Sequence, residues 1–455
     1  MSRLRLGTAL LLVVALAGAC GASPDVRREV AARNAAAARR VTTANTAASG
    51  ATDVAGETLD AGAQAATGTA SGPAAAAINR AAAAPAPAGG NGGATDVGVT
   101  ATSIKIGGTF FNGGFLDKYS QVSEQAANAY FNYVNDQGGV YGRKIQFSGC
   151  DTAGQAQGTA SCVNKFINDD KVFALGPSLD FNLDTVPPII EKAGVPWVGT
   201  SGLYAEEFTS PMMFPTQLKG ADVGAEIATF AAHNLHATTV GVSWVTIGAG
   251  PGCKDRVYQI APALGLRVVV DAVNEDVNNG LSSQVDKIKS ANPDVVLFCN
   301  DPVNNVKFMQ AAGSKDYKAP KGFVGGFVAA DDVPQAMGRA GIGFYGFSSY
   351  DFYKSDSPDM KSYRQITEFY YPRIFHHFYT QAAYTGAVAI VEALKAAGPK
   401  LTRATFVAAL RNMHSLNSMG LSFDFANHGA APSGIILQAD ENLTWHQVTN
   451  RFSAG

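Results

Sequence analysis

The sequence predicts an α/β protein in which mostly parallel sheets, flanked by helices, form two lobes. Two observations support this fold class. From Thr102 onward, short apolar runs alternate with amphipathic stretches, which is the pattern of strands and crossover helices in parallel sheets. This alternating part comprises about 350 of the 455 residues, more than a single hydrophobic core usually supports. We therefore expect two lobes, each with its own sheet.

The first lobe is predicted to begin with a strand at 104–111 and an amphipathic helix at 118–136. That helix carries Ala126, Ala127, Tyr130, Phe131 and Val134 on one face. The series continues with strands at 144–150, 172–176 and 195–199 and helices at 155–168 and 182–192, the last with Pro187 and Pro188 in its first turns.

The second lobe follows the same pattern. Strands are predicted at 239–244, 266–273, 294–299 and 322–327, with helices near 221–232, 254–264, 281–290 and 303–312. A long helix at 379–397 follows an aromatic-rich region, and residues 420–448 are β-rich.

The first 20 residues predict a secretory signal. Arg3 and Arg5 precede an apolar run, Gly7 to Ala19, that is too short to span a bilayer. Residues 16–20 resemble a bacterial lipobox that would place a lipid on Cys20, although Ala17 stands where that motif has Leu. Ordinary signal cleavage remains an alternative. Lipidation would anchor the chain at the outer face of the cytoplasmic membrane.

Residues 21–100 are dominated by Ala, Gly and Thr, and we expect a disordered tether there. Such a composition buries too little apolar surface to offset the entropy lost on ordering.

Composition and motifs argue against several function classes. The net charge of −2 gives no electrostatic footprint for nucleic acid. The run Gly248-x-Gly250-x-x-Cys253 lacks the third glycine of a dinucleotide-binding loop, and Gly199 to Gly202 lacks the spacing of a nucleophile elbow. His233 and His236 lack further metal-ligand spacing. We therefore expect no enzyme, no cofactor and no metal.

Several segments together resemble the branched-chain amino-acid-binding family of type I periplasmic solute-binding proteins, which serve ABC importers. They are TSIKIGG (102–108), NDQGGVYGRKIQ (135–146), DDKVFALGPS (169–178), EKAGVPWVGTS (191–201) and YTGAVAIVEALKAAG (384–398). In the second segment, Gly138, Gly139 and Gly142 permit the turns between a helix and a strand, so this motif marks the fold and not the site.

The resemblance implies two Rossmann-like lobes joined by a multi-crossing hinge, with a ligand held in the cleft between them. We assign 101–218 and 328–415 to lobe 1, and 219–327 and 416–455 to lobe 2. The implied function is capture of a small organic solute, an amino acid or a related apolar compound, by a monomeric lipoprotein that docks on an ABC permease. A ligand-sensing receptor module of the same fold is the alternative.

The resemblance also points to site residues, because open α/β sheets bind ligands beyond the carboxyl ends of their strands. In the family, hydroxyls and amides of the first lobe meet the amino-acid carboxylate; the matching positions are Ser178, Asp180, Ser201 and Leu203. Leu203 lacks a hydroxyl and Asp180 would repel a carboxylate, which puts an ordinary amino acid in doubt. Capping of the following helix is an equally good interpretation of Asp180.

The family's amine-binding acid falls nearest Asn278, or at Glu275 or Asp276 if the register differs. The remaining candidates lie in the predicted strand-end loops and include several aromatics that suit an apolar solute: Asn112, Phe115, Phe181, Tyr204, Asp301 and Phe327. Trp197 and Trp244 are interpreted as core residues.

If Cys20 carries lipid, four cysteines remain for pairing: Cys150, Cys162, Cys253 and Cys299. Export to an oxidising compartment favours disulfides among them. Three pairings are possible. Pairing 150 with 162 and 253 with 299 would match one strand–helix connection in each lobe. This pairing would stiffen the loop after the second strand, beside the expected cleft.

Overall fold

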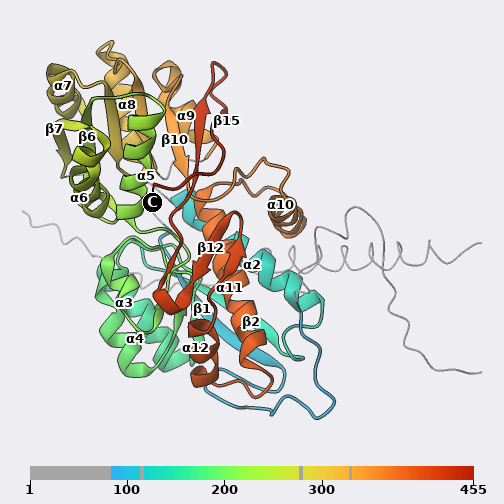
Figure 1. Cartoon of the computed structure of the whole chain (residues 1–455). Helices are drawn as coiled ribbons and strands as arrows, with labels where there is room; N and C mark the ends of the chain where they lie inside the picture. The colour runs from blue at the N-terminus through green and yellow to red at the C-terminus, as the bar shows by residue number, and fades with distance from the viewer. Residues whose placement is uncertain (1–82, 113–116, 276–279, 327–329, 455) are drawn as a thin grey trace, which may run out of the picture. The chain divides into compact units, whose positions relative to one another are not determined.

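A computed structural model describes residues 83–112, 117–275, 280–326 and 330–454 (Figure 1). The predicted signal, Cys20 and the tether as far as residue 82 lie outside the described residues.

Five parallel strands form the first sheet, in the order β2-β1-β3-β4-β5. The strands are β1 (Ser103–Phe110), β2 (Lys144–Asp151), β3 (Ala174–Leu175), β4 (Trp197–Val198) and β5 (Met213–Phe214). The helices of this part are α2 (Asp117–Asp136), α3 (Ala156–Lys165), α4 (Pro187–Ala193), α11 (Phe378–Ala397) and α12 (Arg403–Arg411). Helix α11 packs against α2 and also contacts β4 and α12, so a late segment of the chain returns to the first sheet.

Helix α2 shows how the sequence pattern becomes structure. The five apolar positions predicted to share one face are all buried. The chain then turns through Gly138 and Gly139 at positive φ, and a Cβ at Gly139 would lie 2.1 Å from the carbonyl oxygen of Arg143. Only glycine fits there, which agrees with a structural role for the GGVYGRK motif.

Seven strands form the second sheet, in the order β15-β14-β10-β9-β8-β6-β7. The strands are β6 (Thr239–Val245), β7 (Arg267–Asn274), β8 (Val295–Cys299), β9 (Gly322–Gly325), β10 (Tyr345–Ser348), β14 (Ile435–Ala439) and β15 (Trp445–Gln447). The strands β6 to β10 pair in parallel, whereas β14 and β15 are antiparallel. Figure 1 shows the C-terminal β15 in red beside the orange β10 region. Every residue of β8 is buried, as expected for a central strand covered on both faces.

Helix α5 (Gly220–His233) precedes β6, and the helices between the later strands are α6 (Gly250–Ile260), α7 (Ser282–Ala291), α8 (Pro302–Ser314) and α9 (Asp332–Met337). Helix α10 (Pro358–Tyr370) follows β10. A small antiparallel sheet contains β11 (Leu416–Ser418), β12 (Leu421–Asp424) and β13 (Gly429–Ala430). Single helical turns occur at Phe166–Asp170, Leu183–Thr185, Ala205–Phe208, Ala261–Leu264, Gly338–Gly341 and Phe425–Asn427. The predicted α/β fold with two mainly parallel sheets is thus confirmed.

Two segments differ from the sequence-based boundaries. Strand β10 lies in the range assigned to lobe 1, but it pairs with β9 and β14 of the second sheet. Residues 83–100 were assigned to the tether, yet they make specific contacts with the folded part: Ala84 pairs with Val140, and the backbone N–H of Arg403 donates to Asp96 at 2.7 Å. Neither partner is close in sequence, so local composition could not reveal the contact.

Candidate functional site

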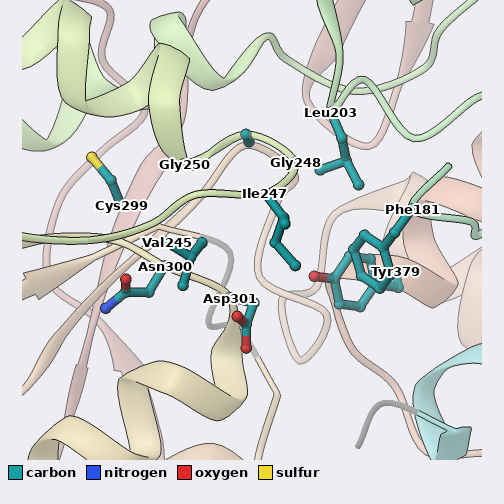
Figure 2. Close-up of a pocket in the computed structure, with 11 residues that line it drawn as sticks. Phe181, Leu203, Val245, Ile247, Gly248, Gly250, Cys299, Asn300, Asp301 and Tyr379 are labelled. Atoms are coloured by element: carbon teal, nitrogen blue, oxygen red, sulfur yellow. The ribbon is translucent and has the colours of Figure 1, made fainter. Parts of the chain in front are cut away.

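A pocket lies where loops from the two sheets meet (Figure 2). Its described lining residues are Phe181, Leu203, Val245, Ile247, Gly248, Ala249, Gly250, Cys299, Asn300, Asp301 and Tyr379. Phe181 and Leu203 follow β3 and β4, whereas Val245 and Cys299 end β6 and β8. The pocket therefore lies at the carboxyl ends of both sets of parallel strands, where α/β sheets bind ligands. The cavity is narrow, with a volume of about 30 Å³.

The walls of the pocket are mainly apolar. Phe181 packs on Phe111 with ring centroids 4.7 Å apart, which orients its ring. Leu203 faces Gly248 of the other sheet, and a Cβ at Gly248 would lie 3.8 Å from the Leu203 Cβ. In Figure 2, Tyr379 lies beside Phe181, and its hydroxyl is directed toward the side where Ile247 and Asp301 lie. Such a lining suits the apolar part of an organic molecule.

Two polar side chains enter this lining from the loop after β8. Asn300 donates through Nδ2 to the Ser243 hydroxyl at 3.0 Å, and its Oδ1 has no hydrogen-bond partner among the described residues. Asp301 caps helix α8 by accepting from the backbone N–H groups of Val303 at 2.9 Å and Asn304 at 3.0 Å. Burial raises the pKa of the Asp301 carboxyl, and these hydrogen bonds oppose the rise.

Tyr379 stands at the start of helix α11, directly after the N-cap residue His377 and Phe378. Burial raises the pKa of the Tyr379 hydroxyl, and the nearby charge of Asp301 adds to the rise. The hydroxyl is therefore a neutral donor or acceptor across the physiological pH range.

The loop after β4 holds a buried carboxylate that sequence reasoning missed. Glu207 accepts from the backbone N–H groups of Gly202 at 2.7 Å, Leu203 at 2.9 Å and Tyr204 at 3.0 Å. The Ser201 hydroxyl lies 3.2 Å from the same carboxylate, and the Glu207 residue is fully buried. Burial raises its pKa, and the hydrogen bonds oppose this shift. The signal available in the sequence was a Glu three positions after Tyr204, the spacing at which a Glu side chain accepts from the N-cap amide of a helical turn.

Ser178 and Ser201, predicted to face a ligand, instead make hydrogen bonds inside the protein. The Ser178 hydroxyl accepts from the Trp197 indole N–H at 3.1 Å and from the Thr109 N–H at 3.0 Å. Ser201 donates toward the carbonyl oxygen of Asp180 and toward Glu207. Both hydroxyls thus connect the ends of neighbouring strands. Trp197 is fully buried, as a core residue is expected to be.

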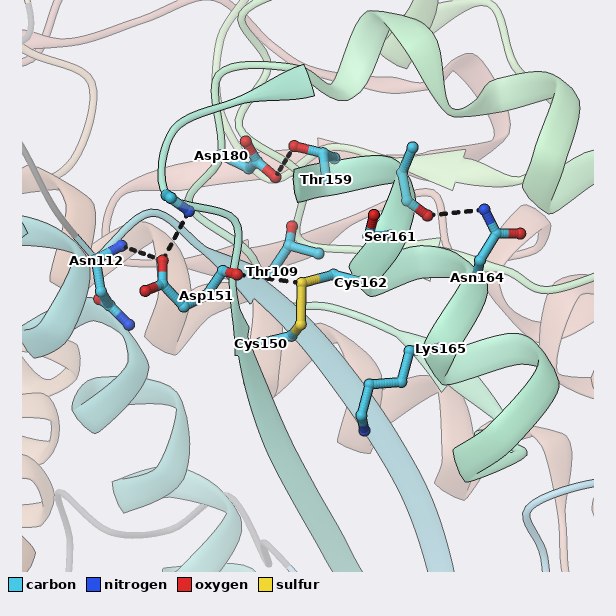
Figure 3. Close-up of a disulfide and its surroundings, with 12 residues drawn as sticks. Thr109, Asn112, Cys150, Asp151, Thr159, Ser161, Cys162, Asn164, Lys165 and Asp180 are labelled. Carbon is cyan, nitrogen blue, oxygen red and sulfur yellow. Dashed lines mark hydrogen bonds between the residues drawn. A yellow bond between two sulfur atoms is a disulfide. The ribbon is translucent and has the colours of Figure 1, made fainter. Parts of the chain in front are cut away.

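Asp180 also turns away from the pocket. Its carboxylate accepts from the Thr159 hydroxyl of helix α3 at 2.8 Å (Figure 3). It also accepts from the backbone N–H of Asn182 at 3.2 Å. Burial raises the pKa of this carboxyl, and the Thr159 hydrogen bond lowers it. Neither interpretation matches this arrangement: Asp180 is not among the pocket-lining residues, and the N-cap of the turn that follows, Leu183–Thr185, is Asn182.

Asn112 and Tyr204 are likewise held by neighbouring segments. The backbone N–H of Asn112 donates to Asp151 at 2.9 Å, and the Tyr204 hydroxyl donates to the carbonyl oxygen of Phe181. Phe181, Leu203 and Asp301 are the predicted site residues that the structure places in the pocket. Phe115, Asn278 and Phe327 lie outside the described residues.

Several of the other lining residues lie in predicted strand-end loops but were not themselves candidates. Ile247 to Gly250 follow β6, and Asn300 follows β8, where strand-end loops were expected. Tyr379 was missed because it begins a long helix; the aromatic run His377-Phe378-Tyr379 before that helix was the available signal.

Two disulfides join Cys150 to Cys162 and Cys253 to Cys299, in the predicted pairing. The first links the end of β2 to helix α3 near Asp151 and Asp180 (Figure 3). The second links helix α6 to the end of β8, so that Cys299 lies in the pocket wall. Both cross-links therefore hold strand ends on the side where the pocket opens.

Within the described residues, no three His, Cys, Asp or Glu side chains gather as a metal site. In that same part of the chain, no helix is both long and apolar enough to span a membrane.

A family model described as "Periplasmic binding protein" matches residues 103–442. The chain belongs to the periplasmic binding protein family. Members of this family bind ligands and are not enzymes, in agreement with the prediction from sequence. A comparison with curated proteins found no match.

Solved structures share the fold of this periplasmic binding protein at low identity. A fatty acid ABC transporter substrate-binding protein from Thermomonospora curvata is 22% identical, with a TM-score of 0.71 over 81% of this chain and 96% of that one. A solute-binding protein of an R. palustris ABC transporter, in complex with 4-hydroxybenzoate, is 19% identical, with a TM-score of 0.68 over 77% and 97%. A leucine-binding protein from Thermotoga maritima is 18% identical, with a TM-score of 0.66 over 77% and 99%.

Proposed function

We propose that this periplasmic binding protein is the extracytoplasmic solute-binding subunit of an ABC importer. It captures a small organic solute in the pocket of Phe181, Leu203, Ile247, Asp301 and Tyr379. The observation that carries the proposal is the pocket itself, because loops at the carboxyl ends of both parallel sheets supply its walls. The substrate-binding roles printed for the three structural relatives add support.

The apolar walls favour an apolar or aromatic solute over a polar amino acid. Phe181, Leu203 and Tyr379 offer hydrophobic surface, and Asp301 and Asn300 supply the polar contacts that orient a ligand. A branched-chain amino acid remains the alternative suggested by the resemblance in sequence.

Binding is proposed to proceed by hinge closure. A cavity of about 30 Å³ is far smaller than the several hundred Å³ typical of ligand pockets, so a solute requires the walls to part before it enters. The two lobes then close on the solute, each lobe contributing part of the contacts. The liganded monomer docks on a membrane permease, and the predicted lipid on Cys20 keeps it at the outer face of the membrane.

The test begins with the purified exported protein. Its co-purified solute is extracted and identified by mass spectrometry, and small-angle scattering is compared with and without saturating solute. We expect compaction on binding. Uptake of the labelled solute by cells with and without the protein then separates an importer subunit from a receptor module. Unchanged scattering at saturation would contradict hinge closure, and unchanged uptake would favour the receptor.

A further inference from the structure

We infer that the pocket selects a solute without a carboxylate, namely a neutral apolar compound such as an aromatic or aliphatic alcohol, because Glu207 already fills the anion site of the first-sheet loop. This inference rests on the proposed function and narrows its solute class.

The anion site consists of three consecutive backbone N–H groups. Those of Gly202, Leu203 and Tyr204 converge on the Glu207 carboxylate at 2.7 to 3.0 Å, and Ser201 adds a hydroxyl at 3.2 Å. Successive backbone N–H groups arranged in this way form a general binding site for anions. Because Glu207 is fully buried, its carboxylate is part of the folded loop. A solute carboxylate therefore finds these donors occupied.

The same loop presents a hydrocarbon surface to the pocket. With its N–H directed to Glu207, Leu203 places its side chain in the lining, opposite Gly248. A ligand thus meets an isobutyl group at this position, which favours an apolar partner.

On the second sheet, the anion site at the start of helix α8 is also occupied. The first backbone N–H groups of helix α8, an ordinary place for an anion, already bind the carboxylate of Asp301. Asp301 itself lines the pocket and would repel a second negative charge. Its acceptor oxygens suit a hydroxyl or amide donor on the solute.

The described lining of the pocket carries no positively charged side chain. The described lining residues contain no Lys, Arg or His. A carboxylate entering this pocket would leave water for a described lining that holds the Asp301 carboxyl and no Lys, Arg or His, which is unfavourable.

The inference is tested with matched pairs of probes that differ in the carboxylate alone. Calorimetric titration compares 4-hydroxybenzoate with 4-hydroxybenzyl alcohol, and octanoate with octan-1-ol, on the unmodified protein at pH 7.5. We expect the alcohol of the better-binding pair to bind at least about 10-fold more tightly than its carboxylate. Tighter binding of the carboxylate, or extraction of a carboxylate as the co-purified solute, would overturn the inference and leave the proposed function standing. Absence of binding by all four probes, together with no extractable solute, would overturn both.

A second measurement tests the anion site without any solute. Glu207→Ala empties the site, and we expect added acetate to raise the melting temperature of this variant. Glu206→Ala is the matched control, because Glu206 is the exposed neighbour, and acetate should leave its melting temperature unchanged. Glu207→Gln keeps an acceptor oxygen in place and should also be insensitive to acetate. Equal responses of all three variants would contradict the assignment, and the probe pairs decide the inference even where Glu207→Ala fails to fold.

Discussion

The buried guanidinium of Arg143 donates to the carbonyl oxygen of Pro399 at 2.8 Å, which joins segments that are 256 positions apart in the chain. The same side chain donates to the carbonyl oxygens of Thr100 at 2.8 Å, Asn91 at 2.5 Å and Gly93 at 3.0 Å. Arg143 thus holds residues 91–100 against the folded domain through the fixed fork of its donors.

Arg143→Lys is expected to lower the free energy of unfolding by about 3 kcal/mol, because an ammonium group cannot reach four carbonyl oxygens in this arrangement. Limited proteolysis should then cleave within 83–100 at a higher rate than in the unmodified protein. Arg339→Lys serves as the control, since Arg339 is exposed. Equal cleavage rates in the two variants would show that Arg143 does not secure this segment.

Phe181→Ala is expected to weaken binding of the co-purified solute about 10- to 100-fold, since an aromatic wall of the pocket is lost. Titration calorimetry measures the change. Phe369→Ala provides the comparison, because Phe369 lies on α10 and is 60% exposed. If both substitutions leave the affinity unchanged, the pocket is not the binding site.

Asp301→Asn separates the two roles of Asp301. Asparagine caps helices about as well as aspartate, so the free energy of unfolding should change by less than about 1 kcal/mol. A solute that donates a hydrogen bond to Asp301 should lose about 10-fold in affinity, because hydrogen bonds to charged groups are the stronger ones. Thermal unfolding and calorimetry measure the two effects. Large loss of stability with unchanged affinity would assign Asp301 to the helix alone.

Glu226 predicts a pH dependence of stability. Its pKa is raised to about 7, mainly by burial and also by the charge of Asp222, whereas the backbone N–H of Ala454 and the charge of Arg451 oppose the rise. Between pH 4.5 and 7 the folded state therefore binds more protons at this site than the unfolded state, and the free energy of unfolding falls as the pH rises. The loss is at most about 3 kcal/mol.

Urea unfolding at pH 5 and pH 8 checks this dependence. Glu226→Gln removes the titration and keeps an acceptor for Ala454, so its stability should decline less between the two pH values. The comparison with the unmodified protein isolates Glu226 from the other buried carboxyls, which titrate in both proteins. Parallel changes in the two proteins would rule out Glu226 as the source.

The two disulfides are expected to differ in their effects. Replacing Cys253 and Cys299 by Ser should lower the free energy of unfolding by about 4 kcal/mol, and replacing Cys150 and Cys162 should lower it by about 3 kcal/mol. The difference arises because the Cys253–Cys299 bond closes the longer loop. The variant that lacks Cys253 and Cys299 should also weaken solute binding, since Cys299 lines the pocket. Thermal unfolding and calorimetry on both variants provide the comparison, and equal affinities would contradict a supporting role for Cys253–Cys299.

Much of the fold could be predicted because it follows from local patterns. The apolar face of α2 follows from the spacing of its apolar residues along the chain. The turns at Gly138 and Gly139 follow from the residue type at each position. The cysteine pairing followed from the same layout, since each bond links a strand end to a nearby helix. Strand β10 was misplaced because its partners, β9 and β14, are chosen by tertiary pairing.

The candidate site was predictable only at the level of loops. Sequence placed Ser178, Ser201 and Asp180 at strand ends, and the structure keeps them there, but each side chain turns toward an internal partner. The direction of a side chain depends on which donors and acceptors lie nearest in space, and those partners come from other segments.

The sequence by itself determined an α/β protein with two mainly parallel sheets, because periodicity and turn residues act over a few positions. Only the tertiary structure decided what the pocket presents to a solute. Glu207 occupies the amides of the β4 loop, Asp301 occupies those of helix α8, and Leu203 and Tyr379 are left as lining. The physical reason is that buried N–H groups require an acceptor, and the fold supplies one from within before any ligand arrives.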